Sequence, residues 1–180
     1  MHLITVDFET YYDSQYSLSK ITTEDYIRHP SFEVIGVSVK VDDGEPEWFS
    51  GTMAQLDKFL DRFPWDDCLA VAHNAMFDMA ILNWHFDIRP KRIADTLSMA
   101  RALDGPDAGN SLAKLAERHG AGIKGTEVIN ALGKGIASLA IGSRSSSVAS
   151  TGSSFTILTT RTVAGAGTMS FTITEGFASA

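Results

Sequence analysis

Hydrophobic positions divide the first 134 residues into short strands and amphipathic helices. Strands are indicated where apolar or β-branched residues run together or alternate, and helices where apolar residues recur every three or four positions. The pattern predicts strands at residues 3–8, 34–41, 47–49 and 68–72. It predicts helices at residues 54–63, 75–84, 96–103 and 111–119.

Turn and cap residues support these boundaries. Asp42-Asp43-Gly44 separates two predicted strands and is typical of a hairpin turn. Asn74 is a plausible N-cap for the helix that follows it, and Gly120 is placed to close the last helix. A hairpin followed by alternating strands and helices predicts an α/β fold, with a mixed sheet covered by helices.

The end of the chain has a different composition. The last 45 residues hold 18 Ser or Thr and only three charged residues, Arg144, Arg161 and Glu175. We therefore expect a partial domain at 1–134 and a Ser/Thr/Gly/Ala-rich tail at 135–180. Residues 153–160 and 168–174 alternate enough to be strands, so the tail is either flexible or a poorly specified β-hairpin. We expect it to be weakly ordered.

The composition excludes several classes of protein. With 44% hydrophobic and 21% charged residues the chain is typical of a globular protein, and no apolar run approaches the ~20 residues that span a bilayer. The N-terminus does not resemble a secretory signal. The single cysteine, Cys68, excludes an internal disulfide and a thiolate zinc site, which favours a reducing cytoplasm.

The net charge of −7 argues against binding nucleic acid through a basic surface. It does not argue against an enzyme that binds phosphate groups through metal ions, because carboxylates are needed to hold those ions.

Two carboxylates are paired near the N-terminus, in Val6-Asp7-Phe8-Glu9-Thr10. Residues i and i+2 of a strand point to the same face, so Asp7 and Glu9 would project together, opposite Val6 and Phe8. Two adjacent anions repel unless a cation lies between them, and oxygen ligands suit Mg²⁺ or Mn²⁺. The alternative is a solvated strand end.

A third carboxylate follows the strand predicted at 68–72. In His73-Asn74-Ala75-Met76-Phe77-Asp78, Asp78 lies in the first turn of a helix of mainly apolar residues. The helix dipole alone could explain an acid there. A strand, a tight turn and a carboxylate at a helix start also form the kind of site that α/β proteins use to bind ligands. We interpret His73 as a turn residue rather than a metal ligand.

D-x-E on a first strand followed by H-N-x-x-F-D resembles the first two motifs of the DEDD exonucleases, which have an RNase H-like fold. Residues 1–134 resemble more closely the proofreading 3′-5′ exonuclease domain of family A DNA polymerases, in particular the phage and prophage type. Further stretches that carry this resemblance are WFSG, VAHNAMFDMAIL, IADTLSMARAL and KGTEVINALGK. The Asp95-Thr96 pair is supportive, and we expect Asp95 to be structural.

The resemblance implies a function and a set of site residues. Asp7, Glu9 and Asp78 would be the catalytic metal ligands for two Mg²⁺ or Mn²⁺ ions, one to activate water and one to stabilise the leaving 3′-oxygen. The substrate-binding residues would be Thr10, Asn74 and Phe77. The substrate would be the 3′ end of single-stranded DNA, with its bases stacked on apolar or aromatic groups.

The third motif of the family, an aspartate on a late helix four or five residues after a tyrosine or histidine, has no counterpart here. No aspartate follows Asp107, no tyrosine follows Tyr26, and His119 has no aspartate after it. We expect the second metal site to be compromised and activity to be weak or lost, unless a partner chain supplies the motif or a polymerase domain. The alternative function is a catalytically dead remnant that binds single-stranded nucleic acid or another protein.

The abrupt change near Lys134 suggests a frameshift or truncation in a polymerase gene, while a genuine fused β segment is the alternative. Translating the other two reading frames tests this hypothesis. It fails if neither frame encodes an acidic helix with the missing motif.

Overall fold

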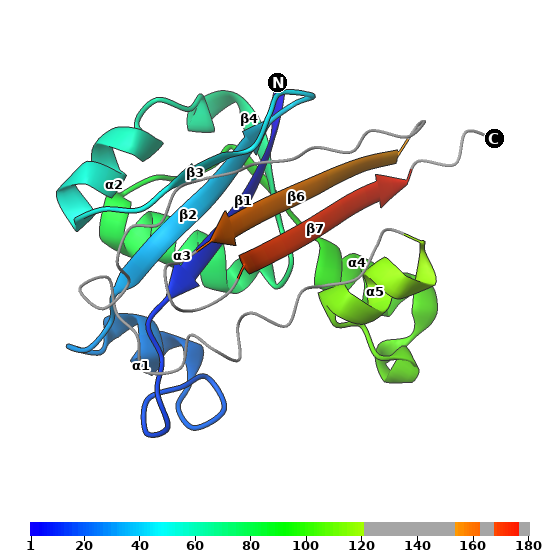
Figure 1. Cartoon of the computed structure of the whole chain (residues 1–180), viewed down its shortest axis with the longest axis horizontal. Coiled ribbons are helices and arrows are strands. Elements are labelled where there is room, and N and C mark those ends of the chain that lie inside the picture. Colours follow the sequence, from blue (N-terminus) through cyan, green and yellow to red (C-terminus); the bar gives the residue numbers. More distant parts are fainter. Residues whose placement is uncertain (121–153, 163–167, 177–180) are drawn as a thin grey trace.

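The computed structural model describes residues 1–120, 154–162 and 168–176. Its centre is a five-stranded mixed sheet with the order β3-β2-β1-β4-β5 (Figure 1). Strand β1 (His2–Thr10) pairs antiparallel with β2 (Val34–Val41) and parallel with β4 (Cys68–Ala72). The edge strands are β3 (Glu47–Phe49), antiparallel to β2, and β5 (Arg92–Asp95), parallel to β4. Within this sheet β2 alone opposes the other strands, which confirms the α/β, RNase H-like fold expected from the sequence.

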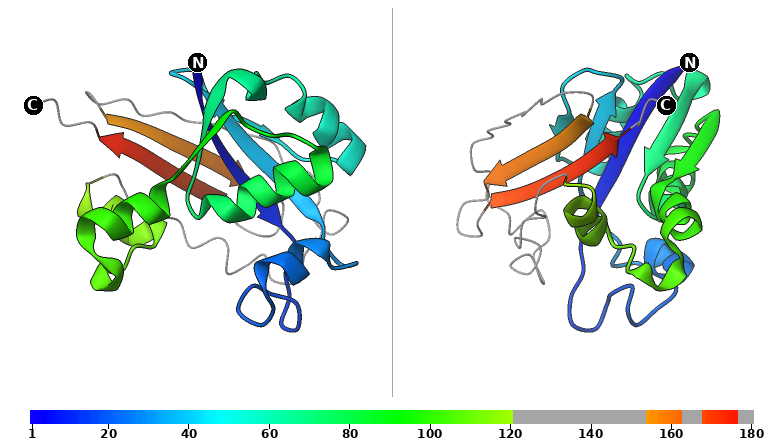
Figure 2. Two further views of the ribbon diagram at one scale, coloured as in Figure 1. Left: turned by 180° about the vertical axis from the view of Figure 1, so that it is seen from behind. Right: turned by 90° about the vertical axis from the view of Figure 1, so that its right-hand side faces the viewer.

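Five α-helices accompany the sheet in the described residues. They are α1 (Thr23–Arg28), α2 (Met53–Leu60), α3 (Ala75–Phe86), α4 (Thr96–Asp104) and α5 (Leu112–Arg118), with single 3₁₀ turns at Trp65–Asp67 and Pro106–Ala108. Helices α2 and α3 lie behind the sheet, with α1 beyond the end of β1, and α4 and α5 lie together at one side (Figures 1 and 2).

The main core lies between the sheet and these helices. Ile4, Val6 and Phe8 of β1 are buried on this side, and Phe8 stacks on Phe86 of α3 with ring centroids 6.1 Å apart. Burying each such side chain contributes about 1.5–3 kcal/mol, and a one-residue slip would turn all three away from the core. The core therefore fixes the register of β1.

The opposite face of the sheet is polar near β1. Cross-strand pairing places Asp7 opposite Ser38 and Thr5 opposite Lys40. Thr5, Ser38 and Lys40 are all buried, at 4%, 8% and 5% exposure. Strands β6 and β7 lie on this side of the sheet (Figure 2). The two faces of the sheet thus separate the apolar core from the face that carries the predicted acids.

Strands β6 (Ser154–Thr162) and β7 (Thr168–Gly176) pair antiparallel in a separate two-stranded sheet. They match the β-hairpin alternative for residues 153–160 and 168–174. The predicted domain boundary near residue 134 and most of the predicted tail at 135–180 lie outside the described residues. Where the chain is described, none of its helices is long and apolar enough to cross a membrane.

Several boundaries differ from the predictions. Helix α2 ends at Leu60 rather than at residue 63, in line with Pro64, whose ring disfavours helical backbone in the residue before it. Helix α3 continues two residues past the predicted end at 84. Helix α1 and strand β5 were not predicted, because six and four residues are too few to show a period.

The turn predictions hold. The N–H of Gly44 donates to Val41 O at 2.9 Å and closes the turn between β2 and β3. Asp42 takes the left-handed backbone conformation there, with φ of 48°. Gly120 has φ of 66° and follows the C-cap of α5, as a closing glycine should.

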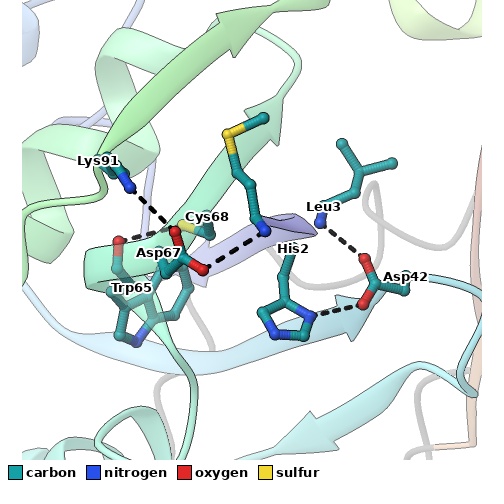
Figure 3. Close-up of polar contacts among 8 residues, drawn as sticks. His2, Leu3, Asp42, Trp65, Asp67, Cys68 and Lys91 are labelled. Carbon is teal, nitrogen blue, oxygen red and sulfur yellow. Dashed lines mark hydrogen bonds and ion pairs between the residues drawn. The ribbon is translucent and has the colours of Figure 1, made fainter.

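The N-terminal end of β1 is anchored by ion pairs (Figure 3). Asp42 accepts a hydrogen bond from the His2 ring at 2.7 Å, which lowers the pKa of the Asp42 carboxyl. Asp67 accepts from Lys91 Nζ at 3.0 Å, and this contact likewise lowers the pKa of Asp67. The neighbouring Cys68 is buried in the core with a free thiol.

Candidate active site

Strand β1 extends beyond its parallel neighbour. Its pairing with β4 ends at Thr5, whereas its pairing with β2 continues to Thr10. The register with β2 shifts between Glu9 and Thr10, which is the irregularity of a β-bulge. Bulges of this type re-aim side chains and occur often beside active sites. Asp7 and Glu9 therefore lie on a stretch of strand that β4 leaves open on one edge.

Asp78 fills this open edge. It lies in the first turn of α3, is 3% exposed, and its Oδ1 accepts the backbone N–H of Phe8 at 3.0 Å. Phe8 is the residue between Asp7 and Glu9, so the third acid is tied to the backbone that carries the first two. The motifs at residues 7–9 and 73–78 thus meet through this hydrogen bond.

The three acids interact electrostatically. Burial raises the pKa of Asp78 well above its usual range, the negative charge of Asp7 raises it further, and Glu9 adds a smaller effect in the same direction. The hydrogen bond from the Phe8 N–H opposes this rise. A buried carboxylate beside two like charges is unfavourable unless it takes up a proton or a cation compensates it.

This donor set suits a hard divalent cation, because it consists of carboxylate oxygens and carries excess negative charge. The fit is incomplete in geometry. Among the described residues, no group of three or more His, Cys, Asp or Glu side chains is gathered closely enough to hold a metal ion. Asp78 Oδ1 accepts the Phe8 N–H. The three carboxylates therefore do not surround one common metal position.

Tyr26 joins two of the predicted substrate-binding residues. Its hydroxyl donates to the Tyr11 carbonyl and lies 2.9 Å from Thr10 Oγ1, so the Thr10 hydroxyl is the donor in that second contact. Its ring lies 6.0 Å from the Phe77 ring, centroid to centroid. Burial raises the pKa of Tyr26, and Glu9 raises it further. Tyr26 was not predicted as a site residue, because it lies in the short helix α1, whose six residues are too few to show a period.

Asn74, the third predicted substrate-binding residue, occupies the N-cap position of α3 but does not cap it with its side chain. Its backbone is left-handed, with φ of 67° and ψ of 52°, and its side chain is exposed. Asp95 replaces it as the acceptor, taking the N–H groups of Asn74 at 2.9 Å and Ala75 at 3.2 Å on Oδ1. The structural role expected for Asp95 is confirmed. His73, expected to be a turn residue, lies in the turn between β4 and α3, with Nδ1 3.0 Å from Thr96 Oγ1.

Comparison with known proteins agrees with this arrangement. A family model described as 3′-5′ exonuclease matches residues 4–127. The 3′-5′ exonuclease DinG of Staphylococcus saprophyticus is 37% identical over 60 residues, which cover 31% of this chain and 7% of that protein. The chain therefore spans a small part of this curated relative.

Two solved structures have a similar course of the chain. NrnC of Brucella melitensis is 14% identical with a TM-score of 0.48, over 64% of this chain and 50% of that chain. The family B DNA polymerase of Pyrobaculum calidifontis is 16% identical with a TM-score of 0.47, over 68% and 19% of the two chains. These likenesses are too loose to bear on activity. The family model is decisive because it spans more than half of the sequence: the chain belongs to the 3′-5′ exonuclease family.

Proposed function

We propose that this chain removes nucleotides from the 3′ end of single-stranded DNA, with Asp7, Glu9 and Asp78 as the ligands of Mg²⁺ or Mn²⁺. The observation that carries the proposal is the placement of Asp78, which is buried against the Phe8 N–H between the two acids of β1. A bound divalent cation would offset the repulsion among the three acids.

The chain's own residues have separable tasks in this proposal. Asp7 and Glu9 present their carboxylates from the open end of β1, and Asp78 ties that end to α3. Thr10 and Phe77, both in contact with Tyr26, and the exposed Asn74 would contact the terminal nucleotide. Bound divalent cations would supply an activated water and neutralise charge at the scissile phosphate.

We propose further that activity is weak. No aspartate follows Asp107 in these 180 residues, so they contain no match for the fourth carboxylate expected in the family, and we propose that a partner chain could supply it. Loss of one ligand from a metal site commonly costs orders of magnitude in rate. An origin in a phage-type family A polymerase and a cytoplasmic setting are part of the same proposal.

A second candidate is a non-catalytic protein that binds single-stranded nucleic acid or another protein. The spacing of the acids favours it, since no group of three metal-ligating side chains comes together among the described residues. It predicts binding without cleavage.

Nucleotide release from single-stranded DNA tests the first proposal. The substrate carries a label at its 3′ end or its 5′ end, Mn²⁺ is present, and the wild type is compared with Asp7→Ala. Asp43→Ala is the matched control, because Asp43 is an exposed turn residue far from the site. We expect slow release of the 3′ label that requires Asp7 and not Asp43.

Each outcome assigns a function. Release that requires Asp7, beginning at the 3′ end, supports the exonuclease. Absence of release above the Asp7→Ala background refutes it, and binding of the labelled DNA under the same conditions then supports the second candidate.

A further inference from the structure

The turn between β4 and α3 has an unusual backbone that needs support. Asn74 is left-handed, a conformation that non-glycine residues adopt rarely. Its side chain makes no cap hydrogen bond to α3 and is exposed. The turn therefore displays the Asn74 side chain outward, and other residues must hold the backbone in place.

Asp95 provides this support with a single carboxylate. Its Oδ1 accepts three backbone N–H groups, from Asn74 at 2.9 Å, Ala75 at 3.2 Å and Leu97 at 3.1 Å. Its Oδ2 accepts the Ser98 hydroxyl at 2.6 Å. Two helix N-termini, those of α3 and α4, thus share one anion, which both helix dipoles favour. Both oxygens of Asp95 are therefore engaged, Oδ1 with backbone N–H groups and Oδ2 with the Ser98 side chain.

Thr96 contacts the two residues that precede Asn74 in the same turn. Its hydroxyl donates to Ala72 O at 3.3 Å and lies 3.0 Å from His73 Nδ1. Residues 72–75 are therefore each held by Asp95 or Thr96. The turn is thus tied to the start of α4 through backbone groups of residues 72, 74 and 75 and through the His73 ring.

Asp78 does not depend on this support in the same way. It lies four residues after Asn74 on α3, but its contact is with the N–H of Phe8 on β1. A change at Asp95 should release the Asn74 turn while leaving the carboxylates near β1.

We infer that Asp95 is a positioning residue that acts through Asn74: it fixes the left-handed turn and thereby sets the affinity of the protein for the 3′-terminal nucleotide. The inference rests on the proposed function. It predicts a loss of DNA affinity without a matching loss of metal affinity.

A double-mutant cycle tests this inference. Asp95→Ala, Asn74→Ala and the double variant are compared with wild type, and Asp107→Ala serves as an exposed control. Affinity for 5′-fluorescein-labelled single-stranded DNA is measured by anisotropy with Ca²⁺, and Mn²⁺ affinity by calorimetry. Hydrogen exchange of the Asn74 and Ala75 amides reports on the turn directly.

We expect Asp95→Ala to weaken DNA binding by about tenfold in the wild-type background and by less than about twofold when Asn74 is already Ala, as for residues that act as one network. Mn²⁺ affinity should stay within about twofold, and exchange of both amides should accelerate. Asp95→Asn keeps an acceptor oxygen and should retain most of the affinity. If Asp95→Ala does not fold, Asp95→Asn and Ser98→Ala carry the same measurements.

The outcomes separate this inference from the proposed function. Equal losses of DNA affinity in both backgrounds, or unchanged amide exchange, overturn the positioning role. If the wild type neither binds nor cleaves DNA, the proposed function is refuted. The claim that Asp95 positions Asn74 for DNA binding is then refuted as well. Accelerated exchange in that case leaves Asp95 as a support of the fold alone.

Discussion

Replacing Asp78 by Asn should stabilise the metal-free protein while abolishing activity. Asp78 is 3% exposed, and its neighbours Asp7 and Glu9 carry like charges. Asparagine has nearly the same shape, and its Oδ1 can still accept the Phe8 N–H, which now lies 3.0 Å from Asp78 Oδ1. The substitution removes the charge and keeps the hydrogen bond.

The expected gain can be worked out from opposing effects. Burying an unpaired carboxylate costs several kcal/mol after relaxation. Losing the negative charge at the start of α3 costs about 0.3–1 kcal/mol, and the new amide N–H₂ needs partners that the site offers only in part. We therefore expect Asp78→Asn to raise the free energy of unfolding by about 1–3 kcal/mol without metal.

Urea unfolding in EDTA and in excess Mn²⁺ measures this balance. A metal at 100 times its Kd stabilises a protein by about 2.7 kcal/mol, so Mn²⁺ should stabilise the wild type clearly and Asp78→Asn little. Asp43→Asn, at an exposed turn, should change stability by less than about 0.5 kcal/mol in either buffer.

A clear loss of stability for Asp78→Asn in EDTA would refute the reasoning. It would mean that the buried carboxylate is compensated in the metal-free protein, so that no cation is needed to explain it. Equal stabilisation of both proteins by Mn²⁺ would show that the metal binds elsewhere.

Three further predictions concern the frame around the site. Gly36→Ala should lower the free energy of unfolding by about 1–3 kcal/mol in urea, because a Cβ there would lie 2.3 Å from Trp48 Cζ2 and 2.7 Å from a backbone carbonyl oxygen; a neutral effect would show that the sheet adapts. Tyr26→Phe should cost about 1 kcal/mol by the same assay, since it removes the hydroxyl contact with Thr10 and a backbone carbonyl, and unchanged stability would mean that water replaces both. Burial favours a higher pKa for Asp95, but hydrogen bonds from a serine hydroxyl and three backbone N–H groups outweigh it and lower the pKa below 3.8. A carboxyl whose pKa is lower in the folded than in the unfolded state stabilises the fold at pH values above its unfolded pKa. The stability advantage of the wild type over Asp95→Asn should therefore be full above about pH 5 and vanish as the pH falls through the folded pKa. An advantage that grows on acidification would contradict this prediction.

The sequence predicted the parts of the site that follow from local periodicity. Alternation along residues 3–8 placed Val6 and Phe8 in the core and Asp7 and Glu9 on the other face, and the burial of the two apolar residues confirms it. The position of Asp78 in a helical first turn followed from the apolar run after Asn74. These features depend on neighbours within a few residues, which a pattern can reveal.

The contacts that complete the site join distant segments, and no local pattern encodes them. Phe8 and Asp78 are 70 residues apart, and Asn74 and Asp95 are 21 apart. Asn74 looked like an ordinary N-cap, because its left-handed backbone depends on an acceptor from the next β–α unit. The role of Tyr26 could not be read from its own short helix, since its partners Thr10 and Phe77 lie on β1 and α3.

The way α3 is held has a consequence for how the protein is made. The side-chain hydrogen bonds that fix Asp78 and the Asn74 N–H join residues 8 and 78 and residues 74 and 95, all within the first hundred positions. During synthesis, these contacts can form as soon as the first hundred or so residues have left the ribosome, since domains generally fold as units as they emerge. Chains that share this N-terminal segment and continue differently after it would carry the same arrangement of Asp78 and Asn74.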